Sequence, residues 1–418
     1  MFNSLVTSEG YLPAPFLIHI NTKIIMSMLH TAAVLGLLAA IGPFAVDMYL
    51  PAFPAIEKGL NTSVSSAQMT LTVYFIAFGI AQLFYGPYSD QVGRKQPLFL
   101  GLSIFAIGTI GCALSPSVEW LIVSRFVQGI GGAVVMVVPR AIIRDMYTGP
   151  QATRLMAMVM LVISVSPMLA PLAGSWLILI GDWRMIFWVL FVAAIISLVI
   201  TGFMQPETLE KSHRVPVNMR NLIRGCRVLL TDPMFMGVTF IGGFGLASFF
   251  VFVANASFIY TGQFGLTAME FSLAFAVNAI GFFATSQLAA GLGERYGMER
   301  VVFMAVLGFA TFSLLLVALT LLGFGSLFIT IGFLFLANAC LGLVIPTTMV
   351  IALDHHGDIA GLASSLGGTL QMLAGGLMIV IMGPFFDGTT LPMVSAIAIC
   401  ACASTLLTWR NSPNAKPA

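Results

Sequence analysis

Residues 184–204 read RMIFWVLFVAAIISLVITGFM, and this stretch decides the class of fold. It is apolar almost throughout, and its length matches the ~20 residues that a helix needs to cross about 30 Å of hydrocarbon. Strands of a membrane barrel would instead alternate in polarity over segments of ~10 residues. A continuous apolar run of this length therefore predicts a helix that spans a membrane.

Runs of the same kind recur along the whole chain, and they predict twelve spans. The predicted spans are 31–52, 67–87, 97–115, 120–142, 153–178, 184–204, 234–258, 269–292, 300–322, 325–350, 359–383 and 390–409. The fold class that follows is an all-α membrane protein with twelve transmembrane helices.

The composition supports this fold class and excludes several others. Of the 418 residues, 59% are hydrophobic and only 8% are charged, whereas soluble domains carry roughly 25% charged residues. The formal net charge of +2 gives no broad field that would attract DNA or RNA. An ordinary soluble enzyme, a nucleic-acid-binding protein and a disordered chain are thus excluded, and the expected surroundings are a lipid bilayer.

Positive charge is distributed unevenly between the two sides of the predicted membrane. If the N-terminus is cytoplasmic, all but three of the 18 Lys and Arg residues fall on the inner side. The exceptions are Lys58 and Arg184 on the outer side and Arg125 within a span. Because Lys and Arg concentrate in cytoplasmic loops, both termini are predicted to be cytoplasmic.

The longest polar stretch divides the spans into six and six. We expect a lead at 1–30, a six-helix bundle at 31–204, a cytoplasmic linker at 205–233, a second six-helix bundle at 234–410 and a tail at 411–418. Two compact bundles joined by one linker are typical of transporters with two related halves.

An internal repeat supports this division. The loop at 86–95 reads GPYSDQVGRK and the loop at 290–300 reads AGLGERYGMER, so that Gly93 aligns with Gly297 and Asp90 with Glu294. At the same offset Asp47 corresponds to Val251 and Arg125 to Ile329, so the second half lacks both charges. Proton chemistry, if present, is therefore expected in the first half.

The loop at 86–95 has the residues of a gating element. Gly86 and Gly93 permit a tight turn and a close approach of helices. Asp90 can accept hydrogen bonds or pair with an arginine, while Arg94 and Lys95 hold the loop in the cytoplasm. The alternative is a turn whose only role is to carry positive charge on the inner side.

Two ionisable residues lie clearly inside spans, Asp47 and Arg125. Such groups are costly in a membrane and by default suggest a functional site. Their depths match, so a pair is geometrically possible; the alternatives are a fixed ion pair or a capped helix end. Asp47 is the better proton carrier because arginine does not titrate usefully.

Further motifs give a resemblance to a known family. Span 4 reads RFVQGIGG from Arg125, span 5 contains SPMLAPLAG from Ser166, and span 1 ends VDMYLPAFP from Val46. With the loop at 86–95, WRxxF from Trp183 and the linker start Pro206-Glu207-Thr208, this set resembles the bicyclomycin/chloramphenicol-resistance group of the major facilitator superfamily. The resemblance covers about 31–410, although Ser166 stands where a glycine is usual and the specific motifs are all in the first half.

The resemblance implies the major facilitator fold, a bacterial inner-membrane location and proton-coupled export of drugs. The signature loop is implied to gate the transporter, as is the proline/glycine motif formed by Pro167, Pro171 and Gly174. These three residues share one face of span 5, where they would bend or seal the helix; plain packing is the alternative.

Polar residues within the spans are candidates for substrate binding. They are Asp47, Tyr74, Arg125, Gln128, Asn255, Asn278 and Gln371. The uncharged members are equally candidates for hydrogen bonds that hold helices together. The stripe of Arg125, Gln128, Gly129, Gly132 and Met136 either lines a cavity or allows tight packing.

The expected function is a proton-coupled antiporter that expels small amphipathic, antibiotic-like molecules and works as a monomer. The alternative within transport is an exporter of one metabolite, such as a sugar, a siderophore or an amino-acid derivative. A membrane enzyme lacks a recognisable nucleophile or HExxH motif, and a channel lacks charge rings or a carbonyl filter. We expect no cofactor and no metal, because Asp354, His355, His356 and Asp358 resemble a metal site in composition only.

Overall fold

The computed structural model describes residues 14–216, 219–354, 356 and 359–411. In this part of the chain the elements are all helical, which confirms the predicted fold class. Twelve helical segments are long and apolar enough to cross a membrane.

The first six spans use α1 to α8, and their helices follow the predicted runs closely. The bounds are α1 Ala14–Asp47, η1 Leu50–Ala52, α2 Phe53–Gly59, α3 Val64–Val92, α4 Lys95–Ala113, α5 Val118–Gly132, α6 Val134–Met146, α7 Gly149–Ile180 and α8 Arg184–Phe203. The helix α1 begins well before residue 31, so residues 14–30 of the expected lead are part of the first helix.

The remaining elements form the linker and the last six spans. Their bounds are η2 Lys211–His213, α9 Met219–Thr231, α10 Pro233–Gly262, α11 Ala268–Tyr296, α12 Met298–Leu321, α13 Leu327–Asp354, α14 Ala360–Met382, η4 Gly383–Phe385 and α15 Thr390–Asn411. The linker region is thus partly helical.

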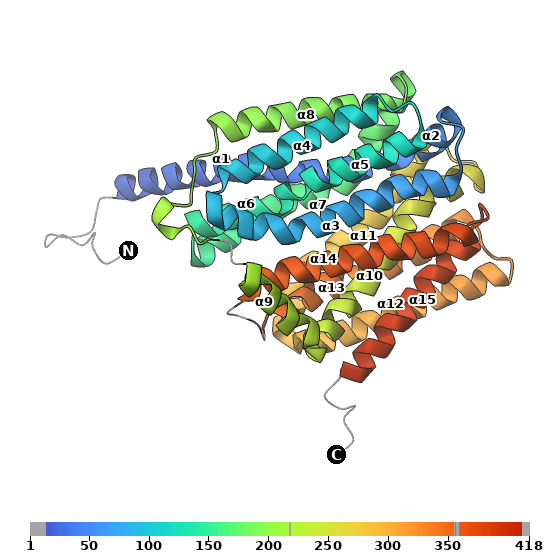
Figure 1. Cartoon of the computed structure of the whole chain (residues 1–418). Coiled ribbons are helices and arrows are strands. Elements are labelled where there is room, and N and C mark those ends of the chain that lie inside the picture. Colours follow the sequence, from blue (N-terminus) through green and yellow to red (C-terminus); the bar gives the residue numbers. More distant parts are fainter. Residues whose placement is uncertain (1–13, 217–218, 355, 357–358, 412–418) are drawn as a thin grey trace, which may run out of the picture.

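The helices α1 to α8 lie together as one bundle, and α10 to α15 lie together as a second (Figure 1). The two halves meet where α3 packs against α14 and where α7 packs against α11. We call the end of the molecule that carries α2 the α2 end, and the opposite end, which carries α9, the linker end.

The buried apolar core shows where the halves are joined. One cluster of buried residues runs through α1 to α8 and continues into the α2-end parts of α10, α11 and α15. The linker-end part of the second half has a separate cluster around Phe235, Val302 and Val344. The core is therefore continuous between the halves at the α2 end and divided at the linker end.

Candidate transport site

Arg125 is the centre of the buried polar site in the first half. Its side chain on α5 is fully buried, and its Nη1 donates to the carbonyl of Ala45 at 3.1 Å and to Oε1 of Gln128 at 2.6 Å. The guanidinium lies over the rings of Tyr49 and Tyr74, with 4.5 and 4.4 Å to the ring centroids. Cation–π contacts of this kind contribute about 2 kcal/mol or more when they are desolvated.

The glycines after Arg125 fix its position by close helix packing. A methyl group on Gly129 would lie 2.5 Å from the carbonyl oxygen of Tyr74, and one on Gly131 would overlap the backbone nitrogen of Phe105. Gly129 of the stripe therefore allows α5 to pack against the backbone of α3, and Gly131, which is outside the stripe, allows it to pack against the backbone of α4. This contact settles the role of the glycines as tight packing, while Arg125 and Gln128 contribute the polar groups.

Several polar atoms around Arg125 have no hydrogen-bond partner. They are Nε and Nη2 of Arg125 and the hydroxyl of Tyr74. A buried donor without an acceptor costs ~1–3 kcal/mol, more when it is charged. The site thus presents unused donors to a carboxylate, a water or a substrate acceptor.

Asp47 is the last residue of α1 and is only 6% exposed. None of the ion pairs among the described residues includes it, so the possible pair with Arg125 is not formed in this conformation. The chain continues through Tyr49, whose hydroxyl shares a 2.7 Å hydrogen bond with Oγ1 of Thr70. Asp47 and Arg125 consequently belong to neighbouring elements but do not form an ion pair.

The halves are bonded to each other at the α2 end through α3 and α10. The Gln68 side chain donates to Oδ1 of Asn255 at 2.9 Å and to the carbonyl of Ala254 at 3.1 Å. The rings of Phe53 and Phe258 stack nearby with 5.4 Å between their centroids. Asn255 is thus engaged in closing the α2 end.

A second contact between the halves joins α7 and α11. The hydroxyls of Ser175 and Ser272 lie 2.7 Å apart, and Ser272 also donates to the carbonyl of Pro171 at 2.9 Å. The helix α7 continues through Pro167 and Pro171, and a methyl group on Gly174 would overlap the carbonyl of Met48. The motif therefore combines a close contact with Met48, the residue that follows α1, and a polar contact with the second half.

The loop predicted to gate the transporter lies at the linker end between α3 and α4. Gly93 has a φ of 102°, and a Cβ there would lie 2.5 Å from Oε2 of Glu207, so a glycine is required at this turn. Gly86 instead lies within α3, and a methyl group there would meet only ordinary contacts. The expected role in a tight turn thus applies to Gly93 and not to Gly86.

Arg94 connects this loop to α6. It pairs with Asp90 at 2.6 Å and with Asp145 at 2.7 Å, although it is only 4% exposed. Burial opposes its charge, but the two carboxylates together raise the pKa of Arg94 above its ordinary value. The loop is therefore locked to the end of α6 while Arg94 stays charged.

The start of the linker completes this lock. Oε1 of Glu207 accepts a hydrogen bond from the backbone nitrogen of Arg94 at 2.8 Å, and Oε2 accepts one from that of Lys95 at 3.2 Å. The Lys95 side chain donates to the carbonyl of Gly202 at 2.8 Å. Partial burial works against the carboxylate, but these backbone hydrogen bonds lower the pKa of Glu207.

The other predicted binding residues lie in the second half. Asn278 is bonded to the carbonyl of Ala274 at 3.1 Å and to Asn338 at 3.4 Å, and Gln371 is buried on α14.

His356, from the cluster with the composition of a metal site, contacts Asp232 at 2.8 Å. Of the other predicted cluster residues, His355 and Asp358 lie outside the described residues.

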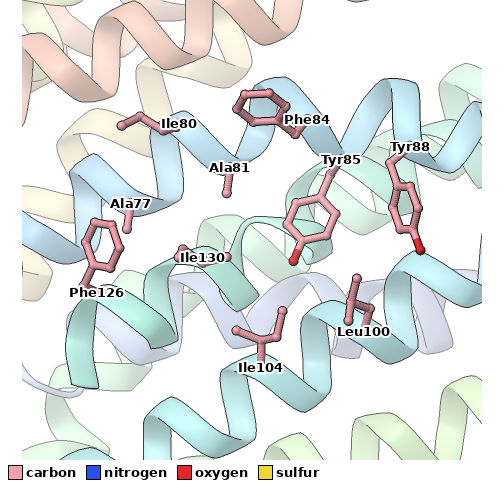
Figure 2. Close-up of a pocket in the computed structure, with 10 residues that line it drawn as sticks. All are labelled: Ala77, Ile80, Ala81, Phe84, Tyr85, Tyr88, Leu100, Ile104, Phe126 and Ile130. Atoms are coloured by element: carbon pink, nitrogen blue, oxygen red, sulfur yellow. The ribbon is translucent and has the colours of Figure 1, made fainter. Parts of the chain in front are cut away.

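A groove of about 400 Å³ lies on the flank of the first half (Figure 2). It is formed by apolar and aromatic side chains from α3, α4 and α5, namely Ala77, Ile80, Ala81, Phe84, Tyr85, Tyr88, Leu100, Ile104, Phe126 and Ile130. The lining contains neither Asp47 nor Arg125, so this groove is separate from the buried polar site.

Sequence reasoning identifies Asn255 as a polar candidate but misses its partners between the halves. Gln68 lies among the polar residues at the start of α3 and carries no motif, and Ser175 was overlooked although it directly follows Gly174. Ser272 and the phenylalanine pairs give no signal without the pairing of helices. Glu207 belongs to the motif Pro206-Glu207-Thr208, but the sequence does not indicate that it bonds to the backbone of Arg94 and Lys95.

In the described part of the chain, twelve apolar helices form two bundles around a buried charged site (Figure 1), which defines the class as a multi-pass helical membrane protein. Residues 35–379 match the Major Facilitator Superfamily, and the chain belongs to this family. It is 30% identical to the bicyclomycin resistance protein homolog of Haemophilus influenzae over 90% of this chain and 96% of that protein.

Two further similarities complete the comparison. The chain is 30% identical to the chloramphenicol resistance protein of Pseudomonas aeruginosa, over 83% of this chain and 82% of that protein. The inward-open structure of the xylose transporter XylE from E. coli shares the fold, with a TM-score of 0.71 and 15% identity over 92% of this chain and 96% of that one.

Proposed function

We propose that the protein exports small amphipathic, drug-like molecules in exchange for protons, with Asp47 as the coupling acid. One observation carries this proposal: in the described part of the twelve spans, Asp47 and Arg125 are the charged residues that are buried. Burial of such groups inside a membrane is costly, so their retention indicates a function.

Competition at Asp47 explains how the two fluxes are coupled. Protonation removes the charge of Asp47, while a bound substrate or the free donors of Arg125 would favour the carboxylate form. The proton and the substrate can each shift the balance between the inward-open and outward-open conformations only if they bind one of these conformations more tightly than the other. Arg125 stays charged throughout and acts as the fixed partner.

The structure is closed at the α2 end, and we propose that this end faces outward. The Lys and Arg residues gather at the linker end, which supports a cytoplasmic position for that end and for both termini. Relatives in Haemophilus influenzae and Pseudomonas aeruginosa support a bacterial inner membrane. In this orientation the buried site would be reached from the cytoplasm.

The loop between α3 and α4 is proposed to control the change of conformation. In the present conformation the ion pairs and hydrogen bonds of Asp90, Arg94 and Lys95 are made within the first half and to the linker, where Val215 donates to the carbonyl of Asp90 at 3.1 Å. When the linker end closes, the same loop can tie the two halves together. The motif of Pro167, Pro171 and Gly174 has the corresponding role at the α2 end.

We further propose that the protein acts as a monomer of two bundles, 31–204 and 234–410, joined by the linker 205–233. Tyr74 and Gln128 lie next to Arg125 and are the best placed of the candidate substrate contacts. Asn278 and Gln371 are expected to contribute amide contacts from the second half, and Asn255 can do so once the α2 end opens.

Transport into inverted membrane vesicles tests the proposal. Chloramphenicol and bicyclomycin are the first probes, because they appear in the names of the relatives. We expect accumulation that requires a pH gradient and collapses when the gradient is dissipated. Accumulation that is unaffected by the gradient would refute proton coupling. If a host that expresses the protein changed only by losing one metabolite from its cells, the alternative of a metabolite exporter would be favoured.

A further inference from the structure

The helix α9 has three distinct faces. Leu222, Gly225, Cys226 and Leu229 form a packed face, with Leu229 fully buried and Gly225 close to Leu362 of α14. At about 100° per residue, Met219, Ile223 and Leu230 fall within about 40° of one another on the adjoining face. These three apolar side chains are exposed, Ile223 by 62%.

The third face of α9 is basic. Arg220, Arg224 and Arg227 fall within about 60° of one another, next to the exposed apolar face. All three are exposed, and the helix contains no acidic residue. The order around the helix is therefore packed, exposed apolar and basic, with Asn221 and the half-exposed Val228 on the remaining side.

The position of α9 is fixed close to the membrane surface. It ends at Thr231, and the membrane-spanning helix α10 begins at Pro233, so one residue separates them. That residue, Asp232, accepts a hydrogen bond from the backbone nitrogen of Met234 and contacts His356 in the segment before α14. The helix α9 also packs against both α10 and α14, at the linker end (Figure 1).

We propose that α9 is an interfacial helix that binds anionic phospholipid. Its exposed apolar face would enter the boundary of the acyl chains, and its three arginines would contact lipid phosphates. A basic helix with an adjoining apolar face binds membranes in this way, and anionic lipid strengthens the attachment. The proposal concerns the linker end and does not depend on which molecule is transported.

Hydrogen–deuterium exchange of the full-length protein in lipid nanodiscs tests this proposal. Nanodiscs of phosphatidylcholine alone are compared with nanodiscs that also contain phosphatidylglycerol, and exchange is followed over residues 219–231. We expect exchange at least about tenfold slower with phosphatidylglycerol, since each basic residue near an anionic surface adds to the attachment. The difference should shrink when ~1 M salt shortens the screening length from about 10 Å to about 3 Å.

Two variants distinguish α9 from other basic surfaces. Combined Arg220→Gln, Arg224→Gln and Arg227→Gln should abolish the lipid difference. Combined Arg154→Gln, Arg295→Gln and Arg300→Gln removes the same charge from other exposed positions and should preserve it.

Three results of the lipid comparison would overturn the proposal. They are equal exchange in both lipids, a lipid difference that survives in the α9 variant, and a difference lost equally in the control. Polyglutamate added to phosphatidylcholine nanodiscs separates a protein partner from a lipid. If it slowed exchange as strongly as phosphatidylglycerol, α9 would instead be a site for an acidic protein segment.

Discussion

Replacing Gln68 by alanine should open the α2 end. The substitution removes two buried hydrogen bonds between the halves, to Asn255 and to the carbonyl of Ala254. At a net ~0.5–1.5 kcal/mol each, their loss should weaken the closed state by about 1–3 kcal/mol. Since ~1.4 kcal/mol is a tenfold change in an equilibrium constant, the balance should shift roughly 5- to 150-fold toward an open α2 end.

The opening can be measured as the distance between two spin labels. The labels are attached at Lys58→Cys and Gly262→Cys in a chain whose five free cysteines have been replaced. Both positions are exposed at the α2 end, one on α2 and one at the end of α10. We expect Gln68→Ala to add or enlarge a population with a longer distance.

Asn278→Ala is the matched control, because its hydrogen bonds remain within the second half. It should lower stability without changing the distance. An unchanged distribution for Gln68→Ala, or an equal shift in both variants, would refute the assignment of Gln68 to the closure.

Three further predictions concern packing, the loop lock and the buried cation. Gly174→Ala should lower the free energy of unfolding by about 1–3 kcal/mol because α7 must move away from Met48. Its control is Gly332→Ala, where the added methyl group meets open space and should raise the free energy of unfolding by up to about 1 kcal/mol. Equal melting temperatures for the two variants would contradict the contact with Met48. Glu207→Gln should lower the melting temperature in detergent. Because the folded-state pKa of Glu207 is lowered from its ordinary value, the difference from the native chain should be full at neutral pH and disappear as the pH falls through that lowered pKa. A difference that persists in acid would argue against the carboxylate. Arg125→Lys should abolish export in vesicles, since an ammonium cannot stack on two rings and also bond as the guanidinium does, and full activity would show that charge alone suffices.

The sequence predicts the helices well because membrane spans are decided locally. An apolar run of ~20 residues has few alternatives in lipid, so the run at 184–204 became α8 almost residue for residue. Asp47 and Arg125 stand out as candidates for the same reason, since charge inside such a run is conspicuous, and both are buried in the structure. The start of α1 was not found, because the short apolar piece before residue 31 is interrupted by polar residues.

The contacts between helices were beyond the sequence because they depend on which elements meet. Gln68 and Asn255 are 187 positions apart, and each looks like an ordinary polar residue in a span. The conformation is equally invisible in the sequence, since the proposed transport cycle requires the same chain to form contacts at the linker end in another state. The aromatic surroundings of Arg125 arise only when α3, α8 and the segment after α1 pack around α5.

The central claim is that a proton and the substrate share Asp47. Drug accumulation driven by a pH gradient is the most direct measurement, compared in inverted vesicles for the native chain, Asp47→Asn and Asp182→Asn. Asp182 is an exposed carboxylate paired with Arg184 and controls for the loss of an acid. We expect Asp47→Asn to lose accumulation against a gradient while it retains exchange of drug across the membrane, and Asp182→Asn to transport normally. Accumulation by Asp47→Asn at the native level would contradict the account.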